Sequence, residues 1–225
     1  MKIECFELGF FLLTIITFIQ QLLTKEEIKY KLEHFTFGNK LWNEFAPYRN
    51  NEIPQKVDAK NAAVALHIKV LKSKIQIILI ERSKYPGMHS QQIAFPGGKK
   101  DINDLSLEDT ARRESLEEIG IKMSNGALVG ELSEVYIPVS NFKVKPFVFF
   151  HEEYPSLQRN QREVNSIFQC SLEEIDTQTK KTFKDIKINK ELTLKRIPGI
   201  QYKKHFIWGA TALILHEFNT AIQTI

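Results

Sequence analysis

One helix, predicted from about Ser106 to Ile119, constrains the fold of this chain more than any other feature of its sequence. Ser106 followed by Asp109 fits a capping box at the start of the helix, and Gly120 is a natural stop at its end. A glycine pair, Gly97-Gly98, comes shortly before the helix and closes a run of strand-type residues. Because glycine lets the backbone approach a ligand closely, this order predicts a site where strand, glycines and helix meet.

Three carboxylates lie on one side of a single turn of this helix. Glu114, Glu117 and Glu118 are three and four residues apart, so their side chains are neighbours. Like charges at this spacing destabilise a helix by a few tenths of a kcal/mol per pair, on the order of 0.2–0.5. Glu114 and Glu118 also border the stripe expected to pack on a sheet, where an unpaired carboxylate is costly. That stripe consists of Leu107, Ala111, Ser115 and Ile119.

A bound divalent cation explains these acids better than a solvated acidic face, which is the usual reason for a Glu-rich helix. Hard oxygen ligands suit Mg²⁺ or Mn²⁺, so Glu114, Glu117 and Glu118 are the predicted metal ligands. Arg113 lies one turn before Glu117 and is placed to pair with it and hold it in position.

The whole segment resembles the Nudix box, in which a glycine and an upstream Glu precede Arg-Glu-U-x-Glu-Glu-x-Gly-U, with U an aliphatic residue. The matching residues are Arg113, Glu114, Glu117, Glu118, Gly120 and Ile121. Three departures are visible. Ser115 replaces an aliphatic residue, the spacing from Gly98 to Arg113 is one residue longer, and the upstream Glu is missing, with Asp104 as the nearest replacement.

The surroundings of the box resemble coenzyme A pyrophosphatases over roughly residues 40–225. Gln91 and Gly87 depart from that pattern, in a loop expected to contact the substrate. The segments that carry the resemblance are Phe45 to Arg49, Ile78 to Ser83, His89, Gln92 to Gly98, Thr110 to Glu114, Val144 to Val148, Arg162 to Val164 and Ile207 to Ala212.

The resemblance implies an α/β Nudix fold, an α/β/α sandwich with a mixed sheet between helices. It also implies metal-dependent hydrolysis of coenzyme A or acyl-CoA to adenosine 3′,5′-bisphosphate and (acyl-)4′-phosphopantetheine. Catalytic roles would fall to Arg113, Glu117 and Glu163, the last as a distant general base, although a surface position beside Arg162 is an equal reading of Glu163. Substrate contacts are expected from Arg82, His89, Gln92, Gly97, Gly98 and Lys99.

Two other functions stay open. The first is a Nudix hydrolase of another nucleoside diphosphate derivative, such as ADP-ribose. The second is a binding protein of the same fold that has lost catalysis, which the three retained acids argue against. The net charge of +4 is too small and too scattered for a nucleic-acid binder, so the expected partner is a small nucleotide.

The rest of the chain predicts a mixed sheet flanked by helices. Helices are expected at residues 25–35 and 208–222, with Trp208 packed in the core. A hairpin is one reading of residues 178–195, and a short helical turn is expected at 171–175. Strands are expected at 62–70, 75–80, 92–95, 127–139, 142–150 and 164–170.

Residues 1–24 lie outside the resemblance. Leu8 to Ile19 is an apolar run shorter than the roughly 20 residues that span a bilayer, and no cleavage site follows it. It is either an added helix or a means of membrane association through residues 6–23. The expected division is an apolar extension at 1–24, a helix and irregular lead-in at 25–60, and the Nudix hydrolase domain at 61–225.

The cysteine content bears on the compartment. Cys5 and Cys170 are far apart, which predicts neither a disulfide framework nor a structural zinc site. A reducing compartment is therefore expected, cytoplasmic or organellar, with membrane anchoring as the alternative. The sequence indicates no oligomeric state.

Overall fold

The structure, a computed structural model, describes residues 23–36, 43–46, 58–84, 90–122, 124–187 and 193–224. The helices are α2 (Lys25–His34), α4 (Leu107–Ile119) and α5 (Gly209–Gln223), with a 3-10 turn η1 (Leu172–Ile175). The strands of the main sheet are β1 (Lys60–Leu71), β2 (Lys74–Arg82), β3 (Ile93–Ala94), β4 (Gly97–Lys99), β5 (Ala127–Glu131), β6 (Val135–Ile137), β7 (Phe142–Phe150) and β8 (Val164–Ser171). A smaller sheet contains β9 (Lys181–Lys187), β10 (Thr193–Tyr202) and β11 (His205–Trp208).

The main sheet is mixed. Its central path runs β3-β2-β1-β7-β5, with β4 paired to β1, β6 to β7 and β8 to β2. β1 runs parallel to β7, and every other pairing in the sheet is antiparallel. β1 therefore pairs with three strands along its length, which places it at the centre of the sheet.

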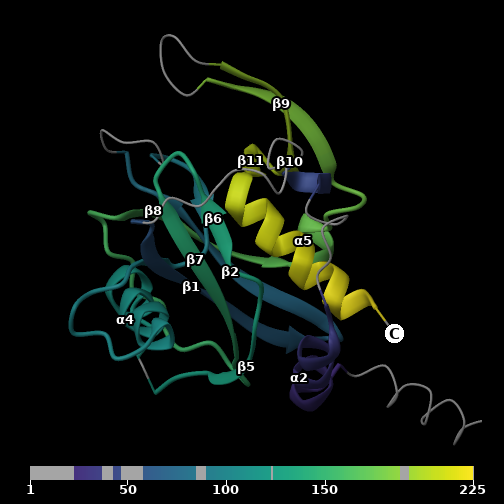
Figure 1. The fold of residues 1–225 in the computed structure, drawn as a ribbon. Coiled ribbons are helices and arrows are strands. Elements are labelled where there is room, and N and C mark those ends of the chain that lie inside the picture. The colour runs from purple at the N-terminus through teal and green to yellow at the C-terminus, as the bar shows by residue number, and fades with distance from the viewer. Residues whose placement is uncertain are drawn as a thin grey trace, which may run out of the picture.

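Helices cover both faces of this sheet, so the expected α/β/α sandwich is confirmed (Figure 1). α4 packs on β1, β4 and β7 on one side, while α5 and α2 lie on the other side. β1 and β2 are buried on both faces, and their runs of Ile, Leu, Val and Ala supply the apolar surface that each layer needs. Ile28 and Leu32 of α2 belong to the same core cluster as Leu66 and Phe218.

The ends of α4 form as the sequence predicts. Ser106 Oγ accepts the Asp109 amide N–H at 3.0 Å, and Asp109 Oδ2 accepts the Ser106 amide N–H at 3.0 Å. Gly120 ends the helix in the left-handed region, at φ 77°. The caps fix where the helix begins and ends. Its contacts with the sheet then determine which side chains face the sheet and which face solvent.

The structure differs from the sequence prediction at three places. The expected strand at 127–139 is split into β5 and β6, separated by Leu132 to Glu134. Gly97–Lys99, expected only to follow the end of the strand at 92–95, forms a strand of its own, because the two glycines pair with Ala63 and Val64 of β1. Trp208 ends β11, and helix α5 starts at Gly209, one residue later than expected.

Two expected features lie outside the described residues, the apolar run from Leu8 to Ile19 and the substrate contact His89. None of the helices in the described ranges is long and apolar enough to cross a membrane.

Candidate active site

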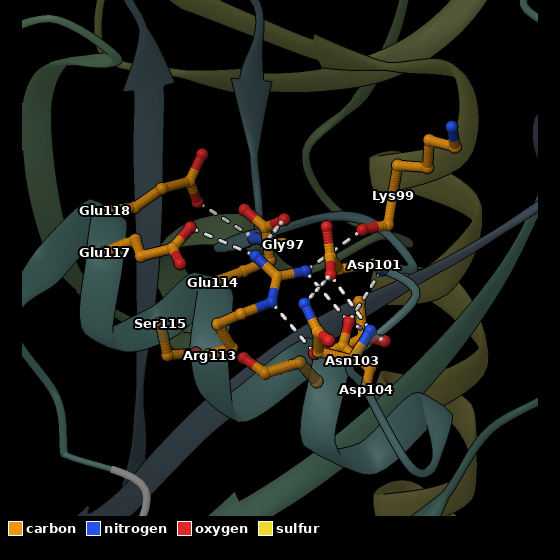
Figure 2. Close-up of polar contacts among 12 residues, drawn as sticks. Gly97, Lys99, Asp101, Asn103, Asp104, Arg113, Glu114, Ser115, Glu117 and Glu118 are labelled. Carbon is orange, nitrogen blue, oxygen red and sulfur yellow. Dashed lines mark hydrogen bonds and ion pairs between the residues drawn. The ribbon is translucent and has the colours of Figure 1, made fainter.

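The three predicted acids differ in how deeply they are buried. Glu118 is 1% exposed, Glu114 is largely buried, and Glu117 is exposed. Figure 2 shows their side chains along one side of α4, beside the backbone of Gly97. The helix thus presents one carboxylate to solvent and inserts two against the strand that carries the glycines.

Glu118 is held by β2 and β4. Its Oε2 accepts the Gly97 amide N–H at 2.9 Å, and its Oε1 lies 3.5 Å from Arg82 Nη1. Burial nevertheless raises the pKa of the Glu118 carboxyl to about 7, since the attraction of Arg82 offsets only part of the lost hydration. A carboxylate in this position needs a further positive partner to stay ionised at neutral pH.

Glu114 lies against Gly98. A Cβ at Gly98 would come within 2.4 Å of Glu114 Oε1, so only glycine leaves room for this carboxylate. Burial also raises the pKa of Glu114, although Arg113 acts in the opposite direction. The glycine pair predicted to admit a ligand therefore accommodates the acids themselves.

Arg113 links the acids to the loop that precedes the helix (Figure 2). Its Nη1 donates to Glu114 at 2.9 Å and to Glu117 at 3.0 Å, so the predicted pairing with Glu117 is confirmed. Its Nε and Nη2 donate to the two carboxylate oxygens of Asp104, at 2.9 and 3.0 Å. This two-point contact from Asp104 fixes the plane of the guanidinium.

Asp104 is the residue whose role the sequence left open. It is 9% exposed, and it also accepts hydrogen bonds from the Asp101 amide and from Thr110 Oγ1, each at 2.8 Å. The hydrogen bonds from Arg113 are the main reason that its pKa is lowered to about 2. Asp104 therefore stays charged throughout the physiological range and orients Arg113 from behind.

The other predicted site residues differ in how they contribute to the site. Lys99 contributes its backbone: its carbonyl accepts from Arg113 Nη2 at 3.1 Å, while its ammonium points away from the acids (Figure 2). The Gln92 carbonyl accepts the Arg82 amide N–H at 3.0 Å, which brings both residues to the end of β2. Glu163 is exposed just before β8, and its charge contributes to raising the pKa of both Glu114 and Glu118.

The carboxylates fit a divalent cation by their chemistry. Within the described ranges, no three His, Cys, Asp or Glu side chains surround one point as metal ligands would, and Arg113 is the counter-charge nearest to Glu114 and Glu117. Two of the acids are nonetheless desolvated oxygen donors whose raised pKa values mark a shortage of positive charge. Hard oxygen donors of this kind are what Mg²⁺ and Mn²⁺ prefer.

A cavity of about 570 Å³ opens beside the glycine strand. Arg82, Gln92 and Gly97–Lys99 form its polar end, and apolar side chains from both sheets and α5 form the remaining wall. Trp208 is part of that wall and is partly exposed, so it lines the cavity instead of filling the core as expected.

Comparison with known proteins agrees with this geometry. A model of the NUDIX domain matches residues 60–192. The Nudix hydrolase NudL of Photorhabdus laumondii is 32% identical over 164 residues, 73% of this chain and 86% of that protein. NudL of Pectobacterium atrosepticum is 33% identical over 147 residues, 65% of this chain and 75% of that protein.

Among solved structures, the MutT/nudix family protein of Enterococcus faecalis has a TM-score of 0.52 at 16% identity, covering 89% of this chain and 75% of that one, which is a likeness of fold. The domain match spans β1 through β9 and includes α4 with its three acids. The chain therefore belongs to the Nudix hydrolase family, enzymes that act on phosphorus-containing anhydrides with the help of divalent metal ions.

Proposed function

We propose that this chain hydrolyses the diphosphate of coenzyme A or of an acyl-CoA in the presence of Mg²⁺ or Mn²⁺. The products would be adenosine 3′,5′-bisphosphate and the (acyl-)4′-phosphopantetheine. The proposal extends the family assignment to one substrate class, and it rests on the shape and polarity of the cavity beside Gly97–Lys99.

The apolar cavity is the observation that carries the proposal. A pantetheine arm is a long chain whose gem-dimethyl and methylene groups separate two amides and a hydroxyl, and these hydrocarbon groups suit a wall built from Ile197, Trp208 and their apolar neighbours. The second ribose of ADP-ribose carries several hydroxyls. On an apolar wall those hydroxyls would lose their water without finding partners, which costs roughly 1–3 kcal/mol for each group. Arg82, at the polar end, supplies a positive charge where phosphates would lie.

The residues of α4 would divide the work. Glu114, Glu117 and Glu118 would hold the cation, and Arg113 with Asp104 would keep their side chains in position. The cation, when bound, neutralises the charge of the diphosphate and acts as a Lewis acid. Glu163 is the proposed general base: it is exposed, close enough to influence Glu114 and Glu118, and fixed by the hydrogen bond from the Ser83 amide to its carbonyl at 2.8 Å.

A substrate panel tests the proposal. Purified protein is assayed with Mg²⁺ and with Mn²⁺ on coenzyme A, an acyl-CoA, ADP-ribose and a dinucleoside polyphosphate. We expect kcat/KM for one of the CoA substrates to exceed that for ADP-ribose by at least about tenfold, because about 1.4 kcal/mol corresponds to that ratio. Cleavage of ADP-ribose with coenzyme A left intact would overturn the substrate assignment.

A paired change tests the ligand assignment separately. Glu117→Gln together with Glu118→Gln keeps the size of both side chains and removes both charges, so hydrolysis should fall to background. Glu173→Gln, at an exposed position on η1, is the matched control and should keep full activity. Activity that persists in the double variant would exclude these acids as the metal ligands.

A further inference from the structure

A buried polar chain lies directly beneath the catalytic turn of α4. Ser115 follows Glu114 in sequence, and its side chain points into the sheet and is 0% exposed. Its Oγ lies 2.9 Å from Nε2 of His67 on β1, and Nδ1 of His67 lies 2.9 Å from Nε2 of His151, which follows β7. His67 is 2% exposed and His151 is 4% exposed. Three parts of the fold are thus joined by buried side chains.

Ser115, at one end of this series of hydrogen bonds, determines which group is the donor and which the acceptor in each of them. Ser115 Oγ donates its proton to the Ala111 carbonyl at 2.7 Å, and a carbonyl only accepts. Burial lowers the pKa of His67 well below its ordinary value, so the ring is neutral. Its single proton must then lie on Nε2 and be donated to Ser115, which leaves Nδ1 to accept from His151 Nε2–H.

This direction excludes a nucleophilic role for Ser115. A serine nucleophile gives its proton to a histidine, whereas here the histidine donates and the serine proton is committed to the helix backbone. The hydroxyl is also sealed beneath the helix. The arrangement is therefore a fixed series of hydrogen bonds between the sheet and the helix, not a second reactive centre.

The packing around these hydrogen bonds explains why α4 needs them to fix its orientation on the sheet. The middle of the helix rests on the sheet through small side chains: Ala63 and Ala65 of β1 and Ala111 of α4 share one buried cluster with Phe147 and Phe149, and the larger Ile119 packs at the end of the helix. Small residues let the helix approach closely but interlock poorly, so packing alone resists rotation about the helix axis weakly. A hydrogen bond from β1 to the centre of the buried stripe fixes that rotation.

The rotation matters because Glu114 and Glu118 lie within one turn of Ser115 on the helix. A side chain at a radius of about 5–6 Å moves by about 1 Å when the helix turns by about 10°. Misplacement by that distance is enough to cost about a hundredfold in rate. Glu118 tolerates little movement in particular, since its Oε2 must stay within reach of the Gly97 amide.

We propose that the chain His151–His67–Ser115 positions the catalytic turn of α4, and that His67 and Ser115 are positioning residues for hydrolysis. The inference rests on the proposed catalytic role of the α4 acids. His151 completes the chain from the far side: its backbone N–H donates to the Ile68 carbonyl at 2.8 Å, and its ring fits against Gly126, where an added Cβ would come within 2.7 Å.

Four variants separate positioning from stability. Ser115→Ala leaves Nε2 of His67 unpaired, whereas His67→Leu removes both the donor to Ser115 and the acceptor for His151, so each should lower both the melting temperature and kcat. The double variant removes both polar partners of the contact between β1 and α4 and leaves only His151 without its acceptor, so its melting temperature should rise above that of His67→Leu. His67→Gln keeps an N–H donor near the position of Nε2 and serves as the conservative variant.

The positioning role predicts a specific pattern. We expect kcat to fall about 10–100-fold in both single variants, with KM within about threefold of the wild type. In the double variant kcat should stay low although the melting temperature rises above that of His67→Leu, and His67→Gln should retain most of kcat. A double variant that regains both stability and kcat would show that the chain only stabilises the fold, and it would overturn the proposal.

Two readouts distinguish this failure from failure of the proposed function. Calorimetric titration with Mg²⁺ should give about tenfold weaker affinity in Ser115→Ala than in the wild type. A wild type without Mg²⁺ affinity contradicts the proposed function, whereas equal affinity and equal kcat in both proteins contradict the positioning role alone. ¹⁵N NMR of histidine should show His67 and His151 as neutral Nε2–H tautomers at pH 7, and a charged His67 would contradict the chain.

Discussion

At the scale of single residues, the site is organised around Arg113 instead of around any one acid. The guanidinium touches Asp104 on one side and Glu114 and Glu117 on the other. The carboxylates raise the pKa of Arg113 above its already high value, with its hydrogen bonds to Asp104 as the largest cause, while burial acts in the opposite direction. The charge of Arg113 is therefore permanent, and what can vary is the direction in which the guanidinium points.

Asp104→Asn should disturb that direction. The amide nitrogen of Asn would place a donor against the donors of Arg113, Thr110 or the Asp101 amide. We expect kcat/KM to fall about 10–100-fold, as for other residues that orient a metal ligand, and the melting temperature to fall by several degrees. Steady-state assays and thermal unfolding measure both effects.

Asp101→Asn is the matched control in the same loop. Its side chain is exposed and accepts hydrogen bonds from Asn103, without contact to Arg113. Wild-type activity is expected in this variant. If Asp104→Asn also keeps its kcat/KM, Arg113 is oriented by α4 alone.

The burial of Glu118 predicts a pH dependence of stability in metal-free protein. The folded-state pKa of about 7 lies above the ordinary 4.5, so the folded state binds a proton that the unfolded chain releases. Its contribution is fully present below about pH 4.5 and is lost as the pH rises through about 7. In the presence of a chelator, the free energy of unfolding should therefore be higher at pH 5.5 than at pH 8, on the order of 1–3 kcal/mol.

Glu118→Gln provides the comparison for this pH effect, because a glutamine does not titrate. Thermal unfolding of both proteins from pH 5 to pH 8 should show a slope in the wild type and a much flatter line in the variant. Mg²⁺ should restore stability mainly at pH 8, where the carboxylates are ionised and free to bind it. Equal slopes in the two proteins would assign the pH effect to other groups.

Sequence reasoning predicted the local part of this site and missed the part formed by distant residues. The pairing of Arg113 with Glu117 follows from helical spacing, and it is confirmed. The contact between Ser115 and His67 joins residues 48 positions apart, so no periodicity reveals it. The one signal was Ser115 itself, a polar residue at a position where the Nudix box has an aliphatic one and where the helix packs on the sheet.

At the scale of elements, the site depends on how closely β4 approaches α4. The two glycines of β4 face different neighbours. A Cβ at Gly97 would lie 2.3 Å from the Ala63 carbonyl oxygen, whereas one at Gly98 would meet the carboxylate of Glu114. Sequence reasoning placed the pair at the end of the preceding strand. It could not see that Ala63 and Val64, more than thirty positions earlier in the chain, offer the strand on which the glycines pair.

Alanine at each glycine should give opposite results. Gly97→Ala meets backbone atoms at a φ of 155°, so it should lower the melting temperature strongly. Gly98→Ala meets the far end of a flexible side chain, so the fold should persist while Glu114 is displaced. We expect at least a tenfold loss of Mg²⁺-dependent hydrolysis in Gly98→Ala, with a melting temperature near that of the wild type. Full activity in that variant would mean that Glu114 is not held where the site needs it.

At the scale of the whole molecule, the main sheet and the smaller sheet meet around the cavity. The cavity wall takes Val64 and Phe142 from the main sheet, Ile197 from β10 and Ile214 from α5. The domain match ends at residue 192, so β10, β11 and α5 lie beyond it. The catalytic turn thus lies within the part shared with the family, and much of the apolar wall lies in the part that follows. This division is the reason that substrate choice is harder to infer than the type of reaction.

The packing of α2 on the main sheet bears on where the folding unit begins. The expected division at residue 61 separates α2 from the catalytic domain, and that boundary stays a prediction. In the structure Ile28 is 0% exposed within the core cluster that includes Leu66 of β1, while Tyr30 on the same helix is 55% exposed.

Ile28→Ala should therefore lower the free energy of unfolding by roughly 2–4 kcal/mol, since it leaves a cavity in that core, and Tyr30→Ala by less than about 1 kcal/mol. Denaturant unfolding followed at the tryptophans measures both, with a single shared transition expected. A separate early transition, or equal effects of the two changes, would show that α2 folds independently of the sheet and would support the boundary at residue 61.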